Sequence, residues 1–287
     1  MIVESIIYTI VLIALVIGTY TDFRTREVPD WLNYSLIFMG FGLRTIFTTV
    51  YHDWSYIIEG IFGFVAFLIL ALVMFYAGQW GGGDSKMVMG LGALIGLELS
   101  TNSFLIGFLI NIFIFGAVFG LLFSVYLAIL HRRLFVKEFN RRFAEKRTEK
   151  WFVWVGTIAL LAASLLVPPF MKVSLVVLAG LLLLSFYIFI YLKSVEKASM
   201  IRWVDPEKLT EGDWVVQDVV IGGKRICGPK DLGLEMRQIK RLIRLKKQKK
   251  IKKVLIKYGI PFVPSFLIAF IVTFLYGNFV FQMLGII

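Results

Sequence analysis

The chain has 287 residues, of which 59% are hydrophobic and 17% are charged, and its mean hydropathy is +0.81. Soluble domains contain about 45–50% apolar and about 25% charged residues, so this composition excludes a disordered protein and an ordinary soluble enzyme. The formal net charge is +12 and the pI is near 9.7, which in a membrane protein indicates basic cytoplasmic loops before it indicates nucleic acid.

Eight apolar segments follow one another along the chain, and each predicts a helix in the membrane. They cover residues 2–20, 32–51, 55–78, 86–99, 103–130, 151–168, 172–192 and 260–284. About 20 residues are needed to cross about 30 Å of hydrocarbon, and seven segments are long enough. The fourth is short and glycine-rich, which leaves a half-buried helix open. The first lacks the basic start and the small-residue cleavage site of a signal peptide, so we expect a retained span.

The basic residues predict the orientation of these spans. All but two of the 31 Lys and Arg residues lie in the segments that follow spans one, three, five and seven, namely 21–31, 79–86, 131–150 and 193–259. The exceptions are Lys172, on the other side, and Arg44, inside the second span. Because basic residues accumulate in cytoplasmic loops, we expect these segments in the cytoplasm and both termini outside a cell membrane.

Two of the cytoplasmic segments are longer than turns. Residues 131–150 predict a basic helix on the membrane surface. Within 193–259, residues 213–220 and 224–228 flank Gly222-Gly223 and predict a hairpin, whereas 235–257 predict a basic helix. We expect the apolar face of that helix on anionic headgroups, with substrate handling as the alternative. The fold class is an all-α polytopic membrane protein with about eight spans and a small cytoplasmic α+β insertion. Its expected divisions are 1–130, 131–150, 151–192, 193–259 and 260–287.

Two aspartates stand out by their position in this topology. Asp22 ends the first span, and Asp84 lies at the junction of the third and fourth, so both are expected at the cytoplasmic face. Ionisable groups at the edge of the hydrocarbon are costly and therefore mark candidate functional sites. For Asp22 taken alone, an interfacial carboxylate paired with Arg24 or Arg26 is the plainer interpretation.

The context of Asp84 is more telling, because it follows Gly81, Gly82 and Gly83. Three successive glycines disfavour a helix by about 1 kcal/mol each and allow close approach of another backbone. Irregular backbone at membrane depth is tolerated only inside protein or beside a wet cavity, so we expect a water-accessible site here. Lys86 is either a positive charge acting on Asp84 or an ordinary lysine extending from a helix end towards water.

Two carboxyl groups held close together do not easily ionise at once, so they share a proton. One then activates water while the other protonates a carbonyl oxygen or a leaving nitrogen, which is aspartyl-protease chemistry. Cys227 is the single cysteine, and His52 and His131 lie far apart in the sequence. This residue set predicts no metal site, no disulfide and no cofactor.

The motifs around both aspartates resemble those of one protease family. Gly81-Gly82-Gly83-Asp84 fits the Gly-x-Gly-Asp signature of intramembrane aspartyl proteases. The continuation Ser-Lys-Met, followed by Gly90-Leu-Gly92-Ala-Leu, looks like the type IV prepilin peptidase branch. The upstream segment Asp22-Phe-Arg-Thr-Arg-Glu-Val-Pro-Asp30 matches that branch's first-aspartate motif and is especially similar to archaeal preflagellin and prepilin peptidases. The resemblance covers residues 1–100 and is looser beyond them.

The resemblance implies a six-span protease core in which Asp22 and Asp84 are the catalytic pair. It implies cleavage of membrane-inserted precursors at the cytoplasmic face, just before the hydrophobic helix of a class III signal peptide. Pro261 and Pro264 resemble a proline-bearing last helix that we expect to kink near the site. Glu27 and Asp30 are candidates for attracting the basic leader, or for balancing Arg24 and Arg26. No nucleic-acid partner is expected.

Two other functions remain compatible with the residues. A signal-peptide-peptidase-like protease acting on other membrane substrates would use the same pair of aspartates. An ion-coupled transporter also uses acids beside broken helices, although such sites lie near the midplane and between internal repeats, neither of which the sequence predicts.

Overall fold

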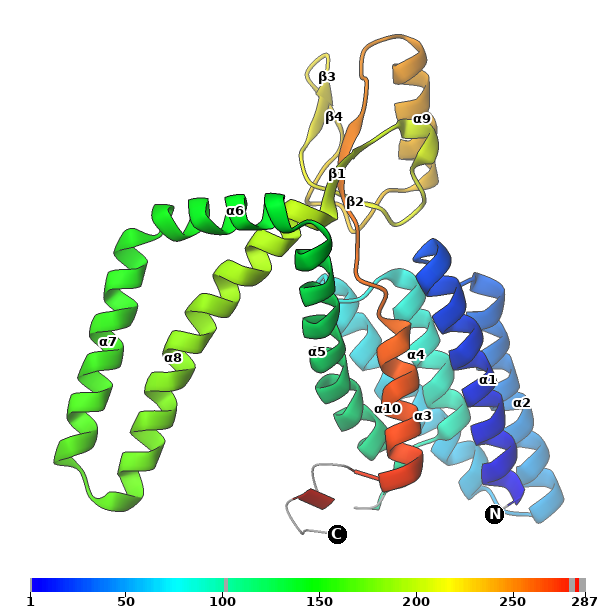
Figure 1. The fold of residues 1–287 in the computed structure, drawn as a ribbon. Helices are drawn as coiled ribbons and strands as arrows, with labels where there is room; N and C mark the ends of the chain where they lie inside the picture. The colour runs from blue at the N-terminus through cyan, green and yellow to red at the C-terminus, as the bar shows by residue number, and fades with distance from the viewer. Residues whose placement is uncertain (1, 101–102, 279–281, 284–287) are drawn as a thin grey trace.

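The computed structural model describes residues 2–100, 103–278 and 282–283. Each of the eight apolar segments contains a helix, as predicted; residues 279–281 and 284 of the last segment lie outside the described residues. Six of these helices form one bundle (Figure 1): α1 (Ile2–Thr25), α2 (Asp30–Tyr51), α3 (Ser55–Tyr76), α4 (Gly82–Ile95), α5 (Phe104–Leu130) and α10 (Val263–Tyr276). Helix α4 packs against α1, α2, α3 and α5 and lies inside the bundle, whereas α10 packs against α1 and α5 and keeps one face exposed.

Among the described residues, five helices are long and apolar enough to cross a membrane: α1, α3, α5, α7 (Arg147–Leu166) and α8 (Pro169–Val195). The chain is therefore a polytopic, mainly helical membrane protein. The expected count of about eight is supported only in part, because α4 and α10 have 14 residues each and α2 is more polar. A 14-residue helix extends only about 21 Å, which is less than the thickness of the hydrocarbon layer.

Arg44 explains how α4 can end inside the bundle. Its side chain is 3% exposed and donates to the carbonyl oxygens of Leu94 (3.1 Å) and Ile95, at the C-terminal end of α4. It also donates to the carbonyl oxygen of Tyr56 at 2.6 Å and forms an ion pair with Glu59 at 3.4 Å. The last carbonyl groups of a helix have no partner within it, so a buried cation there satisfies them and complements the helix dipole.

Glycines allow the helices around α4 to approach closely. A Cβ atom on Gly63 of α3 would lie 2.3 Å from the carbonyl oxygen of Gly92 in α4. A Cβ on Gly40 of α2 would lie 2.9 Å from the backbone of Ala93. Small residues at helix contacts are how membrane helices pack in the absence of a hydrophobic driving force between them.

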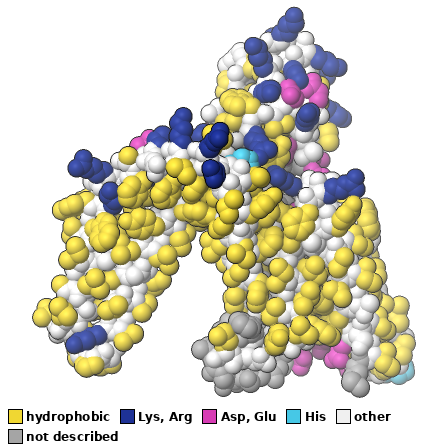
Figure 2. All heavy atoms as spheres, in the orientation of Figure 1, with side chains coloured by type: hydrophobic (Ala, Val, Ile, Leu, Met, Phe, Trp, Pro, Cys, Tyr) yellow, Lys and Arg dark blue, Asp and Glu magenta, His cyan; other side chains and the backbone are white. Residues whose placement is uncertain are grey.

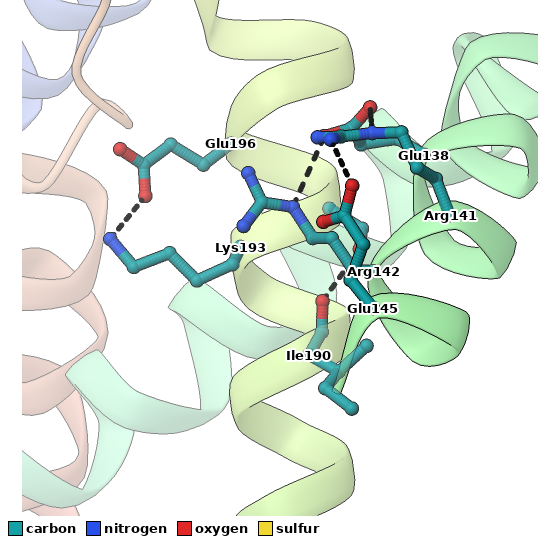
Figure 3. Close-up of polar contacts among 8 residues, drawn as sticks. Glu138, Arg141, Arg142, Glu145, Ile190, Lys193 and Glu196 are labelled. Atoms are coloured by element: carbon teal, nitrogen blue, oxygen red, sulfur yellow. Dashed lines mark hydrogen bonds and ion pairs between the residues drawn. The ribbon is translucent and has the colours of Figure 1, made fainter. Parts of the chain in front are cut away.

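The helices α6 (Arg132–Glu145), α7 and α8 form an arm that extends away from the bundle (Figure 1). The basic helix α6 was predicted. Its aromatic side chains Phe135 and Phe143 contact Tyr191 and Tyr187 of α8. Its charged residues form their own network, in which Glu138 pairs with Arg141 and Arg142 (Figure 3). Helices α7 and α8 pack on each other, and the arm joins the bundle at α5.

The segment between α8 and α10 is a small α+β unit at one end of the bundle (Figure 1). It begins with η1 (Glu196–Met200) and contains β1 (Ile201–Val204), η2 (Pro206–Lys208), β2 (Trp214–Val215), β3 (Val219–Ile221), β4 (Lys224–Cys227), α9 (Met236–Lys247) and β5 (Val254–Lys257). One antiparallel sheet has the order β1-β5-β2, and β3 pairs with β4. Gly222 and Gly223 connect β3 and β4 with φ of +57° and +75°, as a tight hairpin turn requires.

The structure corrects the prediction for residues 235–257. Helix α9 stops at Lys247, and Val254 and Leu255, which lie within the range predicted as helix, belong to the central strand β5. Ile239 and Leu242 of α9 are buried in one cluster with Val254, Ile256 and Cys227. Much of the apolar face of α9 is therefore covered by the sheet, and that part cannot lie on headgroups as expected.

Candidate active site

The first candidate, Asp22, lies in the last turn of α1 and is 4% exposed. Its Oδ2 accepts the backbone N–H of Val263, the first residue of α10, at 2.9 Å. The first N–H groups of a helix have no partner within the helix, and they lie at the positive end of the helix dipole. Both properties attract a carboxylate. Asp22 therefore caps a helix that lies 241 residues further along the chain.

The prolines occupy positions that the sequence analysis did not expect. Pro264 lies in the first turn of α10, and Pro261 precedes the helix. A proline in the first turn removes no helical hydrogen bond, so neither residue kinks the helix interior. The expected kink is wrong; the prolines instead mark where α10 begins, next to Asp22.

The second candidate, Asp84, is the third residue of α4 and is partly exposed. Its Oδ2 accepts the backbone N–H of Gly81 at 3.1 Å, which is half of a capping box at the start of the helix. Asp22 and Asp84 are close enough for their charges to interact. The structure thus brings the two predicted aspartates together from different helices.

The glycines before Asp84 allow the start of α4 to approach the α1–α2 loop closely. Gly81, Gly82 and Gly83 all have negative φ, so the left-handed freedom considered for them is unused. A Cβ on Gly83 would lie 3.2 Å from the backbone N of Val28 in the α1–α2 loop. Asn33 of α2 donates to the carbonyl oxygen of Gly83 at 3.3 Å. These contacts hold the start of α4 against the loop that follows Asp22.

Trp80 is a residue of this site that the sequence analysis missed. It is fully buried, and its ring lies 5.9 Å from that of Phe262 and 5.4 Å from that of Phe266, at the start of α10. The start of α10 therefore supports both aspartates, Asp22 by a hydrogen bond and the α3–α4 loop by aromatic packing. A tryptophan directly before a glycine run was the available signal.

Of the other predicted residues, Lys86 and Asp30 pair with each other, whereas Glu27 lies near the α+β unit. Lys86 forms an ion pair with Asp30 at 2.7 Å and lies over the ring of Tyr34, so these two charges compensate each other. Glu27 is exposed and interacts electrostatically with Asp213 of the α+β unit. Asp213 was not singled out from the sequence. Burial raises its pKa, and the nearby charge of Glu27 raises it further.

The α+β unit contacts both loops of the site. Trp214 of β2 lies against Gly78, where a Cβ would be 3.2 Å from the ring, and Tyr258 lies under the guanidinium of Arg26 at 4.7 Å. Among the described residues, no group of three or more His, Cys, Asp or Glu side chains is arranged to hold a metal ion.

Comparison with known proteins agrees with the motifs. Residues 9–125 match the type IV leader peptidase family. This match contains both aspartates, and it confirms the resemblance drawn from their motifs. No solved structure gives a significant match.

Curated relatives share the same part of the chain. A preflagellin peptidase of Methanocaldococcus jannaschii is 39% identical over 83 residues, which are 29% of this chain and 35% of that protein. One from Methanococcus maripaludis is 40% identical over 88 residues, and one from Methanococcus voltae is 34% identical over 90 residues. The aligned region spans only 35–38% of the length of each relative.

Proposed function

We propose that this chain is an intramembrane aspartyl endopeptidase that removes class III signal peptides from archaellin or type IV pilin-like precursors. The observation that carries the proposal is the pairing of Asp22 and Asp84, one buried and one partly exposed, at the same end of the bundle. The family match over residues 9–125 and the preflagellin peptidase relatives support the same activity and substrate class.

The reaction follows from two carboxyl groups that share one proton. The ionised carboxylate takes a proton from water, and the water oxygen attacks the carbonyl carbon of the scissile peptide. The protonated carboxyl group donates its proton to the carbonyl oxygen. The tetrahedral intermediate then collapses, the peptide nitrogen leaves with a proton, and the pair returns to its starting state.

The charge distribution supports a cytoplasmic site. Figure 2 shows Lys and Arg side chains gathered at the end of the molecule that carries α6 and the α+β unit. Asp22 and Asp84 lie at this end, because α1 ends and α4 begins beneath the unit (Figure 1). Under the positive-inside rule, this end faces the cytoplasm and both termini lie outside. The insertion 193–259 is then cytoplasmic, and α2, α4 and α10 complete the eight membrane segments.

A basic leader needs negative charge near the dyad. Asp30 is compensated by Lys86, which leaves Glu27 as the better of the two predicted residues. Asp213 approaches Glu27 from the α+β unit. We assign these two carboxylates, one from the core and one from the insertion, to attraction of the leader.

Cleavage in reconstituted vesicles tests the proposal. The purified full chain, Asp22→Asn, Asp84→Asn and the control Asp53→Asn are each mixed with archaellin, pilin and unrelated signal-bearing precursors. Loss of either dyad carboxyl group should slow leader release by at least about 10²-fold, because it removes general acid–base catalysis. Asp53 is exposed in the α2–α3 loop, and its replacement should have no effect.

The same assay separates the alternatives. Cleavage that is restricted to the unrelated precursors would assign a signal-peptide-peptidase-like activity. No cleavage by folded wild-type protein, together with a proton flux that depends on Asp22, would assign a transporter. Full activity of a folded Asp84→Asn protein would refute the aspartyl mechanism.

A further inference from the structure

A cavity of about 390 Å³ opens on the side of the bundle where the arm, α5 and the α+β unit meet. Its walls come from the ends of α1 and α5 and from the two connections of the insertion. They include Arg26, His131, Arg202 and Tyr258 as well as apolar residues of α5. None of these residues belongs to the proposed dyad.

The polar part of this cavity is cationic. Arg26 lies 4.7 Å from the centre of the Tyr258 ring, and Arg202 is hydrogen-bonded to Nε2 of His131 at 3.3 Å. Among the described residues, neither arginine has a carboxylate oxygen within ion-pair distance. Asp22 and Asp213 interact with Arg26 only at longer range. Two exposed guanidinium groups thus line one cavity, and neither is held in an ion pair by the part of the chain that the structure describes.

The position of α6 indicates the level at which the cavity lies in the membrane. His131 joins the end of α5 to the start of α6, and α6 runs across the end of the arm (Figure 1). Helix α6 carries aromatic side chains against α8 and many basic residues, which is the composition of a helix lying in the headgroup region. The cationic groups beside its first turn therefore lie at the level of lipid phosphates.

The apolar part of the cavity continues towards the membrane interior. Phe123, Tyr126, Leu127 and Leu130 are spaced so that they lie on one face of α5. Figure 2 shows hydrophobic surface on both sides of the opening between the arm and the bundle, below this level. A ligand that fits both parts carries an anionic head and a long apolar tail.

We propose that this cavity binds one anionic phospholipid, with its phosphate between Arg26 and Arg202 and its acyl chains along α5. Guanidinium groups bind phosphate through charge-assisted, bidentate hydrogen bonds. A basic signal peptide is repelled by the same two charges, so the occupant is not the leader. A soluble phosphate gains nothing from the apolar wall.

Lipid titration of the delipidated, purified full chain tests the site. Native mass spectrometry counts bound phosphatidylglycerol, phosphatidylcholine and glycerol phosphate for wild type and for Arg26→Gln/Arg202→Gln. We expect one tightly held phosphatidylglycerol in wild type and about 30-fold weaker binding in the double variant, since each basic residue near the surface contributes about fivefold. Arg132→Gln/Arg133→Gln on α6 removes the same charge outside the cavity and should leave this lipid in place.

Three results would overturn the proposal. Equal affinity for phosphatidylcholine would show that the charge of the lipid does not contribute to binding. Unchanged binding by the double variant would show that these arginines do not bind the lipid. Glycerol phosphate binding as tightly as the lipid would make this a site for a soluble phosphate. Arg26→Lys/Arg202→Lys should recover most of the affinity, and Arg202→Gln alone provides the test if the double variant does not fold.

Discussion

The bundle and the arm both contain helices that are long and apolar enough to cross a membrane, yet they are packed by different means. In the bundle, glycines and one buried arginine bring α2, α3 and α4 into backbone contact, and the aspartates lie where these helices and α10 meet. In the arm, α7 and α8 contact each other and expose most of their surface. The comparison teaches that hydropathy detects a membrane helix, whereas small residues and buried charge identify the helices that position a site.

The largest expected effect comes from removing the cation that ends α4. Arg44→Met leaves the carbonyl groups of Leu94 and Ile95 without their partner, at about 1–3 kcal/mol for each buried unsatisfied group. We expect a large loss of thermal stability and of cleavage in proteoliposomes. Arg132→Met on α6 is the matched control and should behave as wild type. Wild-type stability of the Arg44→Met protein would show that the buried cation is not needed to end α4 inside the bundle.

A pair of glycine substitutions compares the two regions directly. Gly63→Ala places a Cβ 2.3 Å from the backbone of α4 and should destabilise by about 1–3 kcal/mol. Gly180 of α8 has open space around its Cβ position, so Gly180→Ala should be neutral or stabilise by up to about 1 kcal/mol. Unfolding in a common detergent measures both. Equal effects would show that the arm is packed as closely as the bundle.

The carboxylates assigned to the leader should affect substrate binding more than turnover. In Glu27→Gln/Asp213→Asn, we expect KM for a precursor to rise about fivefold with little change in kcat, because exposed charge pairs contribute at most about 1 kcal/mol each. Asp53→Asn, at the other end of the molecule, is the control. A fall in kcat with unchanged KM would contradict this assignment.

The same pair predicts a pH dependence. The pKa of Asp213 is raised by burial and by Glu27, so its charge is lost at a higher pH than that of an ordinary aspartate. KM should therefore rise as the pH falls through this raised pKa, and the rise should be smaller in Asp213→Asn. Protonation of a carboxyl group with a raised pKa stabilises the folded state, so unfolding of the unit does not explain the rise.

The smallest effect on cleavage is expected from removing the arm, although this is the largest change in the chain. The ends of the arm lie together, since Ser199 Oγ donates to the carbonyl oxygen of Leu127 at 3.3 Å. Replacing residues 132–195 with a short Gly-Ser linker keeps α5 and β1 on the same side of the membrane. The arm joins at α5, and the aspartates lie on α1 and α4, so cleavage should stay within about tenfold of wild type. A folded but inactive deletion protein would place the arm in the catalytic unit.

Features that depend on neighbours in the chain could be predicted from the sequence. Apolar length revealed all eight helices, Gly222-Gly223 revealed the hairpin, and two motifs revealed Asp22 and Asp84. Features that depend on pairing between distant segments could not. The residues of β5 lie in the range that was predicted as a basic helix. They form a strand because they pair with both β1 and β2. Asp213 and the cap on Val263 become visible only when α10 and the α+β unit are in place, whereas Trp80 has a local signal in the glycine run that follows it.

The most direct test of the central claim is a single-turnover cleavage of one archaellin precursor by the full chain in vesicles, with the products identified by mass spectrometry. The paired aspartates predict one defined leader and one mature N-terminus from wild type, and neither product from Asp22→Asn or Asp84→Asn proteins that unfold at the wild-type temperature. The same leader released by either folded variant would contradict the account.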